Sequence, residues 1–225
     1  MIKNLSQRLL KNSGKNYQID PKLPQKFIIS ILTRRFFMLV RGLIKTRRKV
    51  FVGNNVKFNN VRNISFGKSV TIENYCLIDG YSYEKIILGD CVKIGAFSSL
   101  ISTSHMSKYG KGLKMGNNSA VGQFTEFGAA GGIEIGNDVI MGAYISFHSE
   151  NHNFQDPTKL IREQGVTSLG IKIGNNIWVG AKVTFLDGCE IGDNSVVAAG
   201  AVVKGVYPPN SLIGGVPAKI LKTIQ

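Results

Sequence analysis

A strict six-residue period between Ile173 and Val203 constrains the fold more than any other feature of the sequence. Every sixth residue is apolar, and the set is Ile173, Val179, Phe185, Ile191, Val197 and Val203. A small or β-branched residue lies four positions after each of the first five. Neither a helix, with a period of 3.6, nor a strand, with a period of 2, produces this spacing. The repeat indicates a solenoid of short strands and tight corners, in which each turn buries its apolar residues against the next.

The same apolar spacing extends back to residue 52 and predicts seven three-sided coils. The earlier inward positions are Val52, Phe58, Ile64, Phe66, Ile72, Ile78, Leu88, Ile94, Leu100, Met115, Val121, Phe127, Ile135, Met141 and Phe147. The extra residues all come after the third side of a coil, in segments 80–87, 101–114, 128–134 and 148–172. We therefore expect every insertion to leave the solenoid at one edge, and that edge to carry the chemistry.

The repeat also carries a resemblance to a known family. The run GIKIGNNIWVGAKVTFLDGCEIGDNSVVAAGAVV, followed by PPNSLIGGVPAKIL, resembles the C-terminal half of the hexapeptide-repeat acyltransferases, which include the galactoside, maltose and xenobiotic acetyltransferases. It is most similar to the branch that O-acetylates cell-surface polysaccharides or their precursors. The resemblance implies an all-β fold, a left-handed parallel β-helix of about seven coils. It also implies a homotrimer with active sites between subunits, acetyl-CoA as co-substrate, a saccharide acceptor and no required metal.

The chain divides into three expected parts, which are a basic arm at 1–50, the β-helix domain at 51–207 and a C-terminal tail at 208–225. The long loop at 148–172 belongs to the domain. The arm holds 13 of the 28 Lys and Arg residues and one acid, Asp20, so most of the net charge of +14 belongs to it. Such a basic arm suggests a polyanion or an anionic membrane as partner.

Residues 26–49 predict an amphipathic helix with a basic stripe. Lys26, Ser30, Arg34, Arg41, Lys45 and Arg48 fall at helical spacing, and the rest is mostly apolar. One interpretation places this helix on an anionic membrane surface, with the stripe toward the head groups. The other has its apolar face capping the solenoid or packing in an oligomer. Charges interrupt the segment too often for it to cross a bilayer comfortably, and no recognisable nucleic-acid-binding module follows.

Cysteine usage and the N-terminus predict a cytoplasmic protein, and the basic helix at 26–49 allows a peripheral position at the inner face of the cell membrane. Three cysteines, an odd number, argue against a disulfide framework, and no secretory signal is visible. Cys76 and Cys189 fall on inward positions and are expected to be small buried residues.

Histidine is scarce, and two of the three residues lie at the start of the longest insertion. The family places its catalytic histidine there, before a short apolar-acidic-Pro run, which residues 152–157 match. The resemblance therefore assigns the general base to His152, which would take the proton of an acceptor hydroxyl as it attacks the thioester. Glu150 and Asp156 are candidates for holding the other imidazole nitrogen, with a main-chain carbonyl as the alternative.

Further contacts with the acceptor are expected around the same point. His148 would bind the acceptor, contribute to the base or only close its coil. Asn151 and Glu150 are candidate acceptor contacts, and His105 is structural or lines the acceptor.

The donor site is expected on the later coils. Trp178, the only tryptophan, precedes an inward residue and should point outward, where the family places a Trp along the pantetheine arm of coenzyme A. Small residues at Gly180, Ala181, Ala199 and Gly200 would let that arm lie against the backbone, although tight corners also require small residues. Lys204 and Lys219 would meet the phosphates. Because relatives often have Thr-Lys-Asp before the Pro pair, where this chain has Lys-Gly-Val, Lys219 is the stronger candidate.

Three alternatives remain from the sequence. The acceptor could be an amino sugar or a small xenobiotic, which would make the enzyme an N-acetyltransferase in the first case. A trimer like the zinc carbonic anhydrases of this fold would need the three histidines to converge on a metal. A non-catalytic scaffold at the membrane would not depend on His152.

Overall fold

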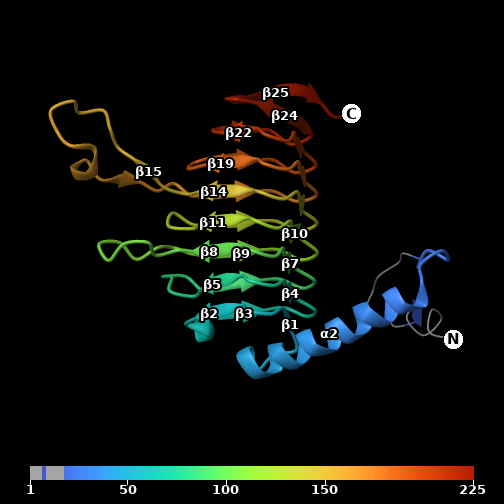
Figure 1. Cartoon of the computed structure of the whole chain (residues 1–225). Helices are drawn as coiled ribbons and strands as arrows, with labels where there is room; N and C mark the ends of the chain where they lie inside the picture. The colour runs from blue at the N-terminus through green and yellow to red at the C-terminus, as the bar shows by residue number, and fades with distance from the viewer. Residues whose placement is uncertain (1–6, 9–17) are drawn as a thin grey trace.

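The chain forms a three-sided prism of stacked coils that stands on one helix (Figure 1). The computed structural model describes residues 7–8 and 18–225. The first part of the expected arm, residues 1–6 and 9–17, lies outside the described residues. Helix α2 (Gln25–Thr46) lies against the first coil, and the coils then rise in sequence order to the C-terminus.

Three parallel sheets form the sides of the prism, and each of the seven coils adds one strand to each sheet. Sheet A contains β1 (Phe51–Val52), β4 (Thr71–Ile72), β7 (Lys93–Ile94), β10 (Ala120–Val121), β13 (Ile140–Met141), β18 (Trp178–Val179), β21 (Val196–Val197), β24 (Ser211–Gly215) and β25 (Ala218–Thr223). Sheet B contains β2 (Lys57–Asn59), β5 (Leu77–Asp79), β8 (Ser99–Ile101), β11 (Glu126–Gly128), β14 (Ser146–His148), β19 (Thr184–Leu186) and β22 (Val202–Val203). Sheet C contains β3 (Ile64–Phe66), β6 (Ile86–Leu88), β9 (Leu113–Met115), β12 (Ile133–Ile135), β17 (Ile171–Ile173), β20 (Glu190–Ile191) and β23 (Val206–Tyr207). This arrangement confirms the predicted left-handed β-helix of about seven coils.

The predicted inward residues form the interior of the prism, because their side chains alternate with outward ones along each short strand. At the centre, the fully buried rings of Phe127, Phe147 and Phe185 stack with centroids 5.0 and 4.9 Å apart. Phe58 and Phe66 are only half-buried, since they lie in the first coil at the open end of the prism. Each coil thus depends on its neighbours for burial.

Polar side chains bind successive coils together at the corner between sheets C and A. The Oδ1 atom of Asn137 accepts the Asn117 N–H at 2.7 Å, and Asn175 and Asp193 repeat this contact in the next two coils. The residues after them, such as Asn118 and Asn176, adopt positive φ, which Asn tolerates better than most residues. The polar pairs of the IGNN and IGDN motifs are therefore corner residues that hold the stack.

An aromatic column marks the corner between sheets A and B. The rings of Tyr75, Phe97, Phe124 and Tyr144 stack coil upon coil, with centroids 4.9 to 5.0 Å apart and neighbouring planes nearly parallel. All four residues adopt φ of 57° to 59° and remain partly exposed. Face-to-face contact between the rings offsets the strain of this backbone conformation.

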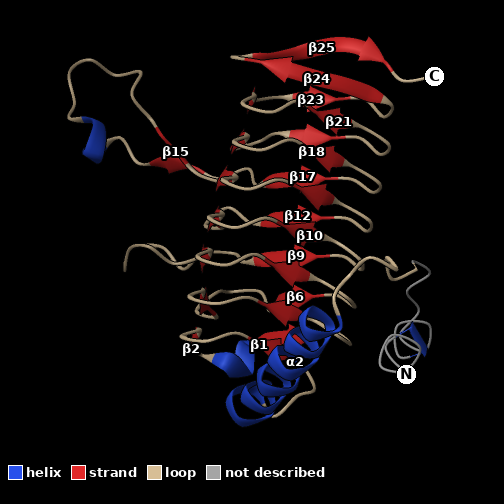
Figure 2. Ribbon diagram, turned by 45° about the vertical axis from the view of Figure 1, so that its right-hand side comes forward, coloured by secondary structure: helices blue, strands red, loops and turns tan. Residues whose placement is uncertain are grey.

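Helix α2 lies against the first coil (Figure 2). Part of its basic stripe contacts the coils, which corrects one expectation. Arg41 Nε donates to the Val52 carbonyl at 2.9 Å, and Lys45 Nζ donates to the Val56 carbonyl at 2.5 Å. Arg34 forms an ion pair with Glu73 at 3.3 Å. Three of the six stripe residues, Arg34, Arg41 and Lys45, therefore face the protein, and for them the predicted orientation toward lipid head groups is wrong. These cations satisfy carbonyls at the exposed end of the solenoid, where an open backbone edge would otherwise remain.

The insertions leave the prism at the edge between sheets B and C, as the spacing predicts. Four connections lie there, at residues 80–85, 102–112, 129–132 and 149–170 (left side of Figure 1). The first coil turns this corner through the short helix η1 (Val61–Asn63). At the other end of the prism, β24 and β25 form an antiparallel hairpin over the last coil, and Tyr207 Oη donates to the Ala218 carbonyl at 2.9 Å.

Two further expectations concern burial and the bilayer. Cys76 and Cys189 are buried as predicted, and burial raises the pKa of the Cys189 thiol to about 12. Within residues 7–8 and 18–225, no helix has both the length and the apolar character needed to cross a membrane.

Candidate active site

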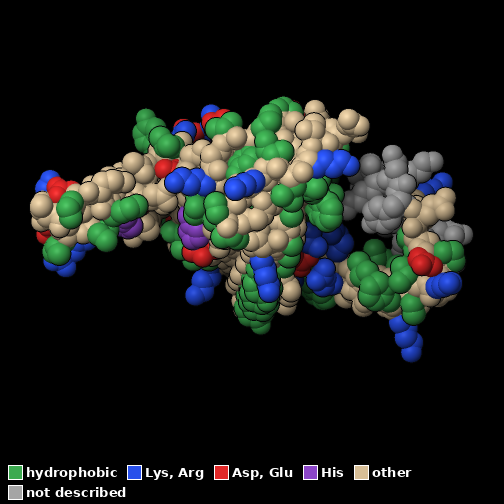
Figure 3. All heavy atoms as spheres, turned by 90° about the horizontal axis from the view of Figure 1, so that it is seen from above, with side chains coloured by type: hydrophobic (Ala, Val, Ile, Leu, Met, Phe, Trp, Pro, Cys, Tyr) green, Lys and Arg blue, Asp and Glu red, His purple; other side chains and the backbone are tan. Residues whose placement is uncertain are grey.

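The long loop begins as a two-stranded ribbon that projects from the insertion edge. It leaves sheet B after His148 and returns to sheet C at β17. Strands β15 (Asn151–His152) and β16 (Val166–Thr167) pair antiparallel, with His152 opposite Val166. Histidine side chains are visible where this loop leaves the prism (Figure 3). The ribbon thus places His152 at the base of the loop rather than at its tip.

The three histidines lie on separate supports. His148 ends β14 with its side chain exposed on sheet B, and His152 is exposed on β15. Across the described part of the chain, neither imidazole has a hydrogen-bond partner, so both can meet a ligand. His105 differs, because its Nδ1 atom lies 2.7 Å from the Ser107 hydroxyl. Among the described residues, no three His, Cys, Asp or Glu side chains gather closely enough to hold a metal ion.

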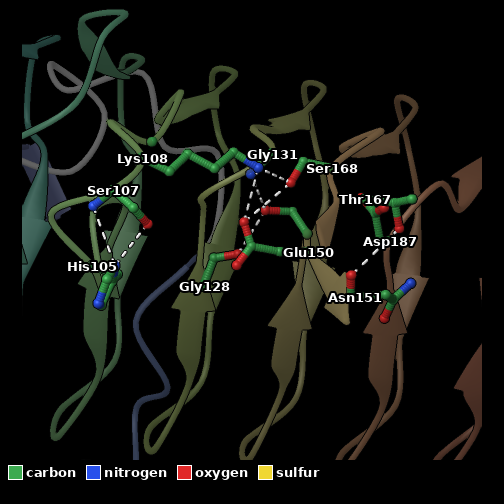
Figure 4. Close-up of polar contacts among 12 residues, drawn as sticks. His105, Ser107, Lys108, Gly128, Gly131, Glu150, Asn151, Thr167, Ser168 and Asp187 are labelled. Atoms are coloured by element: carbon green, nitrogen blue, oxygen red, sulfur yellow. Dashed lines mark hydrogen bonds and ion pairs between the residues drawn. The ribbon is translucent and has the colours of Figure 1, made fainter. Parts of the chain in front are cut away.

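Glu150 joins two insertions instead of orienting His152 (Figure 4). Its Oε2 atom lies 2.9 Å from Lys108 Nζ and accepts a hydrogen bond from the Ser168 hydroxyl at 3.1 Å. Lys108 also donates to Ser168. The loop at 102–112 is therefore tied to both strands at the base of the long loop. The expectation that Glu150 holds the imidazole is corrected by these contacts.

Asp156 is likewise engaged within its own turn. It accepts hydrogen bonds from the Thr158 backbone N–H at 3.0 Å and hydroxyl at 2.6 Å, and pairs with Lys159 at 3.0 Å. These contacts, first of all the Thr158 hydroxyl, lower the pKa of the Asp156 carboxyl. Asp156 shapes the loop, and in this structure it does not contact the ring of His152.

Two residues that sequence reasoning missed anchor the ends of the loop. The buried Ser149 hydroxyl donates to the Gly128 carbonyl at 2.7 Å and accepts the Gly131 N–H at 2.9 Å. Asp187, with only 6% of its surface exposed, accepts the N–H groups of Leu169 and Gly170 at 2.8 Å each. A carboxylate directly after the inward Phe185 strand, outside the Asn/Asp corner positions, was the available signal for this second anchor.

The predicted donor residues cluster on the next two coils. Trp178 points outward from sheet A and is 61% exposed, as predicted. Ala181 and Ala199 are exposed in successive coils at the corner between sheets A and B. Gly180 has a structural reason to be Gly, because a Cβ there would lie 2.5 Å from the Ala199 nitrogen. Gly200 adopts φ of 73° and faces open space.

The two candidate lysines lie apart. Lys219 lies on β25, in the hairpin that extends sheet A beyond the Trp178 strand. Lys204 follows β22 and lies at the insertion edge, at the opposite end of sheet B from Ala199. The structure therefore groups Lys219 with the donor residues and separates Lys204 from them within one chain.

The same separation applies to the two halves of the candidate site. His152 projects from the edge between sheets B and C, whereas Ala181 and Ala199 lie at the corner between sheets A and B. A single prism holds these groups on different edges. One chain thus presents His152 at one edge and Ala181 with Ala199 at another.

The sequence is similar to known acetyltransferases. The family described as bacterial transferase hexapeptide (six repeats) matches residues 170–205, the coils that carry Trp178 and Asp187. The galactoside O-acetyltransferase of Escherichia coli K12 is 34% identical over 94 residues, which cover 41% of this chain and 45% of that protein. Over these segments the chain is similar to hexapeptide-repeat acetyltransferases. A second relative from E. coli K12, WbbJ, is named for lipopolysaccharide biosynthesis O-acetyl transfer; it is 30% identical over 125 residues, 52% of this chain and 64% of WbbJ.

The hexapeptide-repeat fold is also shared with a solved structure of low sequence identity. A mutant of AntD, an N-acyltransferase from Bacillus cereus in complex with dTDP-4-amino-4,6-dideoxyglucose and coenzyme A, superimposes with a TM-score of 0.53 at 18% identity. The match covers 83% of this chain and 89% of AntD and shows the fold. This hexapeptide-repeat chain spans about half to two thirds of the length of the curated relatives that it matches.

Proposed function

We propose that the protein is an acetyl-CoA-dependent O-acetyltransferase that acts on a sugar hydroxyl of a cell-surface polysaccharide or its precursor. The observation that carries the proposal is the exposed His152 on the loop ribbon, one coil below the strand that presents Trp178. Similarity to the galactoside O-acetyltransferase and to WbbJ supports a sugar acceptor.

Direct transfer needs a base, because a sugar hydroxyl is a poor nucleophile at neutral pH. Neutral imidazole suits this task, and His152 would take the hydroxyl proton as the oxygen attacks the thioester carbonyl. The carbon–sulfur bond then breaks, and the same imidazole returns the proton to the departing thiolate. No covalent acyl-enzyme is required if donor and acceptor bind together. A donor aimed at the developing oxyanion would come from the backbone or from a neighbouring subunit.

The donor surface would hold coenzyme A along the corner between sheets A and B. Trp178 would flank the pantetheine arm, Ala181 and Ala199 would let it approach the backbone, and Lys219 would meet a phosphate as a point charge. Asn151 and His148, exposed beside His152, would contact the acceptor. Glu150, held by Lys108, would line the site indirectly by fixing the ribbon.

A homotrimer would complete this site. His152 and the Ala181 corner lie on different edges of one prism, so a second copy must bring its corner to the insertion edge of the first. Lys204, which lies at that edge, would then approach a coenzyme A held by the neighbouring chain. We further propose that the protein acts at the inner face of the cell membrane and contacts it through residues 26–49.

The test is acetyl transfer by the full-length protein with a panel of saccharides, followed by the release of free thiol from acetyl-CoA. His152→Ala should lower the rate by about 10²- to 10⁴-fold, the usual contribution of a general base. His105→Gln is the matched control. The His105 ring already forms a hydrogen bond with Ser107, so this substitution should leave the rate nearly unchanged. Mild alkaline hydrolysis of the product distinguishes the two linkages, because it cleaves an O-acetyl ester and leaves an N-acetyl amide intact.

Two results would contradict the proposal. If saccharide-dependent thiol release persists in His152→Ala, His152 is not the general base. If calorimetry shows that the wild-type protein does not bind coenzyme A, the assignment of the donor surface is wrong.

A further inference from the structure

The face of helix α2 that points away from the prism is apolar. Six side chains at helical spacing form this outer face, namely Ile29, Phe36, Phe37, Val40, Leu43 and Ile44. Ile44 is 75% exposed, and Phe36 and Phe37 are more than half exposed. The opposite side of the helix packs on the first coil through residues such as Met38 and Gly42. The outer face thus points away from the coils along the length of the helix.

A basic cleft adjoins one end of the outer face. Its volume is about 600 Å³, and its cationic lining consists of Lys45, Arg47, Arg48, Arg62 and Lys85. Ile44 lines the same cleft, so the apolar outer face continues directly into it. Lys45 donates to the Val56 carbonyl. In the described part of the chain, the other four cations pair with no carboxylate, which leaves them able to bind an anion.

The charge around this surface is mostly positive, and Glu73, the partner of Arg34, is the first acid to follow. Residues 21–72, which supply α2 and the first coil, contain 12 Lys and Arg residues and no Asp or Glu. Two copies of this surface placed face to face would bring like charges together without a compensating acid, which is destabilising. The chemistry that complements an apolar face beside a basic cleft is an anionic, amphipathic surface.

We propose that the outer face of α2 and the basic cleft dock the base of the prism on a bilayer that contains anionic phospholipid. The apolar side chains enter the acyl boundary, and lipid phosphates occupy the cleft. This inference rests on the membrane contact in the proposed function and assigns it to particular residues. It reverses the orientation expected from sequence for Arg34, Arg41 and Lys45, which bind the first two coils, whereas Arg48 and the neighbouring cleft cations bind lipid.

The position of α2 suits this role. The helix lies across the lower end of the prism, and the long loop projects from a coil well above it (Figures 1 and 2). Docking through the outer face would therefore leave the ribbon and the donor corner accessible. In the proposed trimer of parallel prisms, three such faces would point the same way, which would multiply the affinity for one surface.

The experiment is co-sedimentation of the full-length protein with vesicles of phosphatidylcholine alone or mixed with phosphatidylglycerol. Neither acetyl-CoA nor acceptor is added, so the result does not depend on catalysis. We expect binding to the mixed vesicles only, with release at high salt because exposed charges are screened. The triple variant Arg47→Gln, Arg48→Gln, Arg62→Gln should bind roughly a hundredfold more weakly, since each cation near the surface contributes roughly fivefold.

The apolar half of the surface has its own variant. Phe36→Gln, Phe37→Gln should lower vesicle affinity about tenfold or more, because two half-exposed rings can no longer enter the bilayer. The matched control residues lie away from the lower end of the prism. They are Ile220→Gln with Leu221→Gln for the apolar change, and Arg162→Gln, Lys182→Gln, Lys222→Gln for the charge change, all exposed in the structure. Both controls should bind vesicles as the wild-type protein does.

Three outcomes would overturn the inference. The wild-type protein could fail to bind the mixed vesicles. The control variants could also lose as much vesicle affinity as the variants of the outer face and the basic cleft. The third is a change in oligomer mass on Phe36→Gln, Phe37→Gln with vesicle affinity unchanged, which would make the outer face an interface between copies. Acetyl transfer to a soluble saccharide, assayed on the same variants, separates each of these from a failure of the proposed enzyme activity.

Discussion

Replacing Asp187 by Asn should release the long loop while leaving the prism folded. The carboxylate is buried and accepts the N–H groups of Leu169 and Gly170, the last residues before the chain rejoins sheet C. Hydrogen bonds to a charged acceptor stabilise by about 1.5–3 kcal/mol each. An amide in the same place keeps one neutral acceptor and turns its NH₂ group toward a donor. We therefore expect a loss of about 2 kcal/mol in the free energy that holds the loop closed, roughly a thirtyfold increase in opening.

Hydrogen exchange measured by mass spectrometry tests this magnitude region by region. Peptides that cover residues 149–170 should exchange roughly thirtyfold faster in Asp187→Asn, and the coil peptides should be unchanged, because each coil is held by its neighbours. Asp79→Asn is the control, since Asp79 lies at the same edge in coil two and accepts the Tyr81 N–H at 2.9 Å. Equal exchange of the loop in wild type and Asp187→Asn would refute the anchoring role.

Three other predictions concern the prism. Phe147→Ala, in the central stack, should lower the free energy of unfolding by about 3–5 kcal/mol in denaturant titration; a loss below about 1 kcal/mol would contradict the packing. Burial raises the pKa of the Cys189 thiol to about 12. Above pH 9 the unfolded chain loses this proton and the folded chain keeps it. The free energy of unfolding should therefore fall with rising pH, by up to about 1.4 kcal/mol per pH unit. Cys189→Ala should flatten that slope, and an unchanged slope would assign it to other groups. Arg41→Ala, which removes the bond to the Val52 carbonyl, should speed proteolysis within 25–46, whereas equal cleavage of wild type and variant would argue against the cap.

The coils could be predicted because each inward position repeats a simple constraint. Burial between neighbouring coils selects mostly Ile, Val, Leu or Phe every sixth residue. The positive φ at most corners between sheets C and A selects Asn or Asp. Every insertion follows the third side of a coil, and the six-residue spacing resumes after it. The common edge of the insertions could therefore be predicted from the sequence. Phe58 and Phe66 depart from full burial only because the first coil has an open end.

The site was less predictable, because its contacts join segments with no shared period. Lys108 reaches Glu150 across 42 positions of sequence, and neither residue belongs to a repeat. The orientation of α2 failed for a related reason. Sequence spacing shows that Arg34, Arg41 and Lys45 share a stripe, but only the position of the first coil shows that its carbonyls and Glu73 face them.

The stack of coils also sets a height. Neighbouring strands lie about 4.8 Å apart, so the ribbon of the fifth coil starts about 19 Å above the first. If α2 rests on lipid, an acceptor sugar must extend at least that far from the bilayer to reach His152, because the helix lies between the lipid and the first coil. Sugars closer to the anchor are then out of range. Removing one regular coil would lower the reach by about 5 Å without altering the site itself. The number of coils would then determine which unit of a surface-bound glycan is modified.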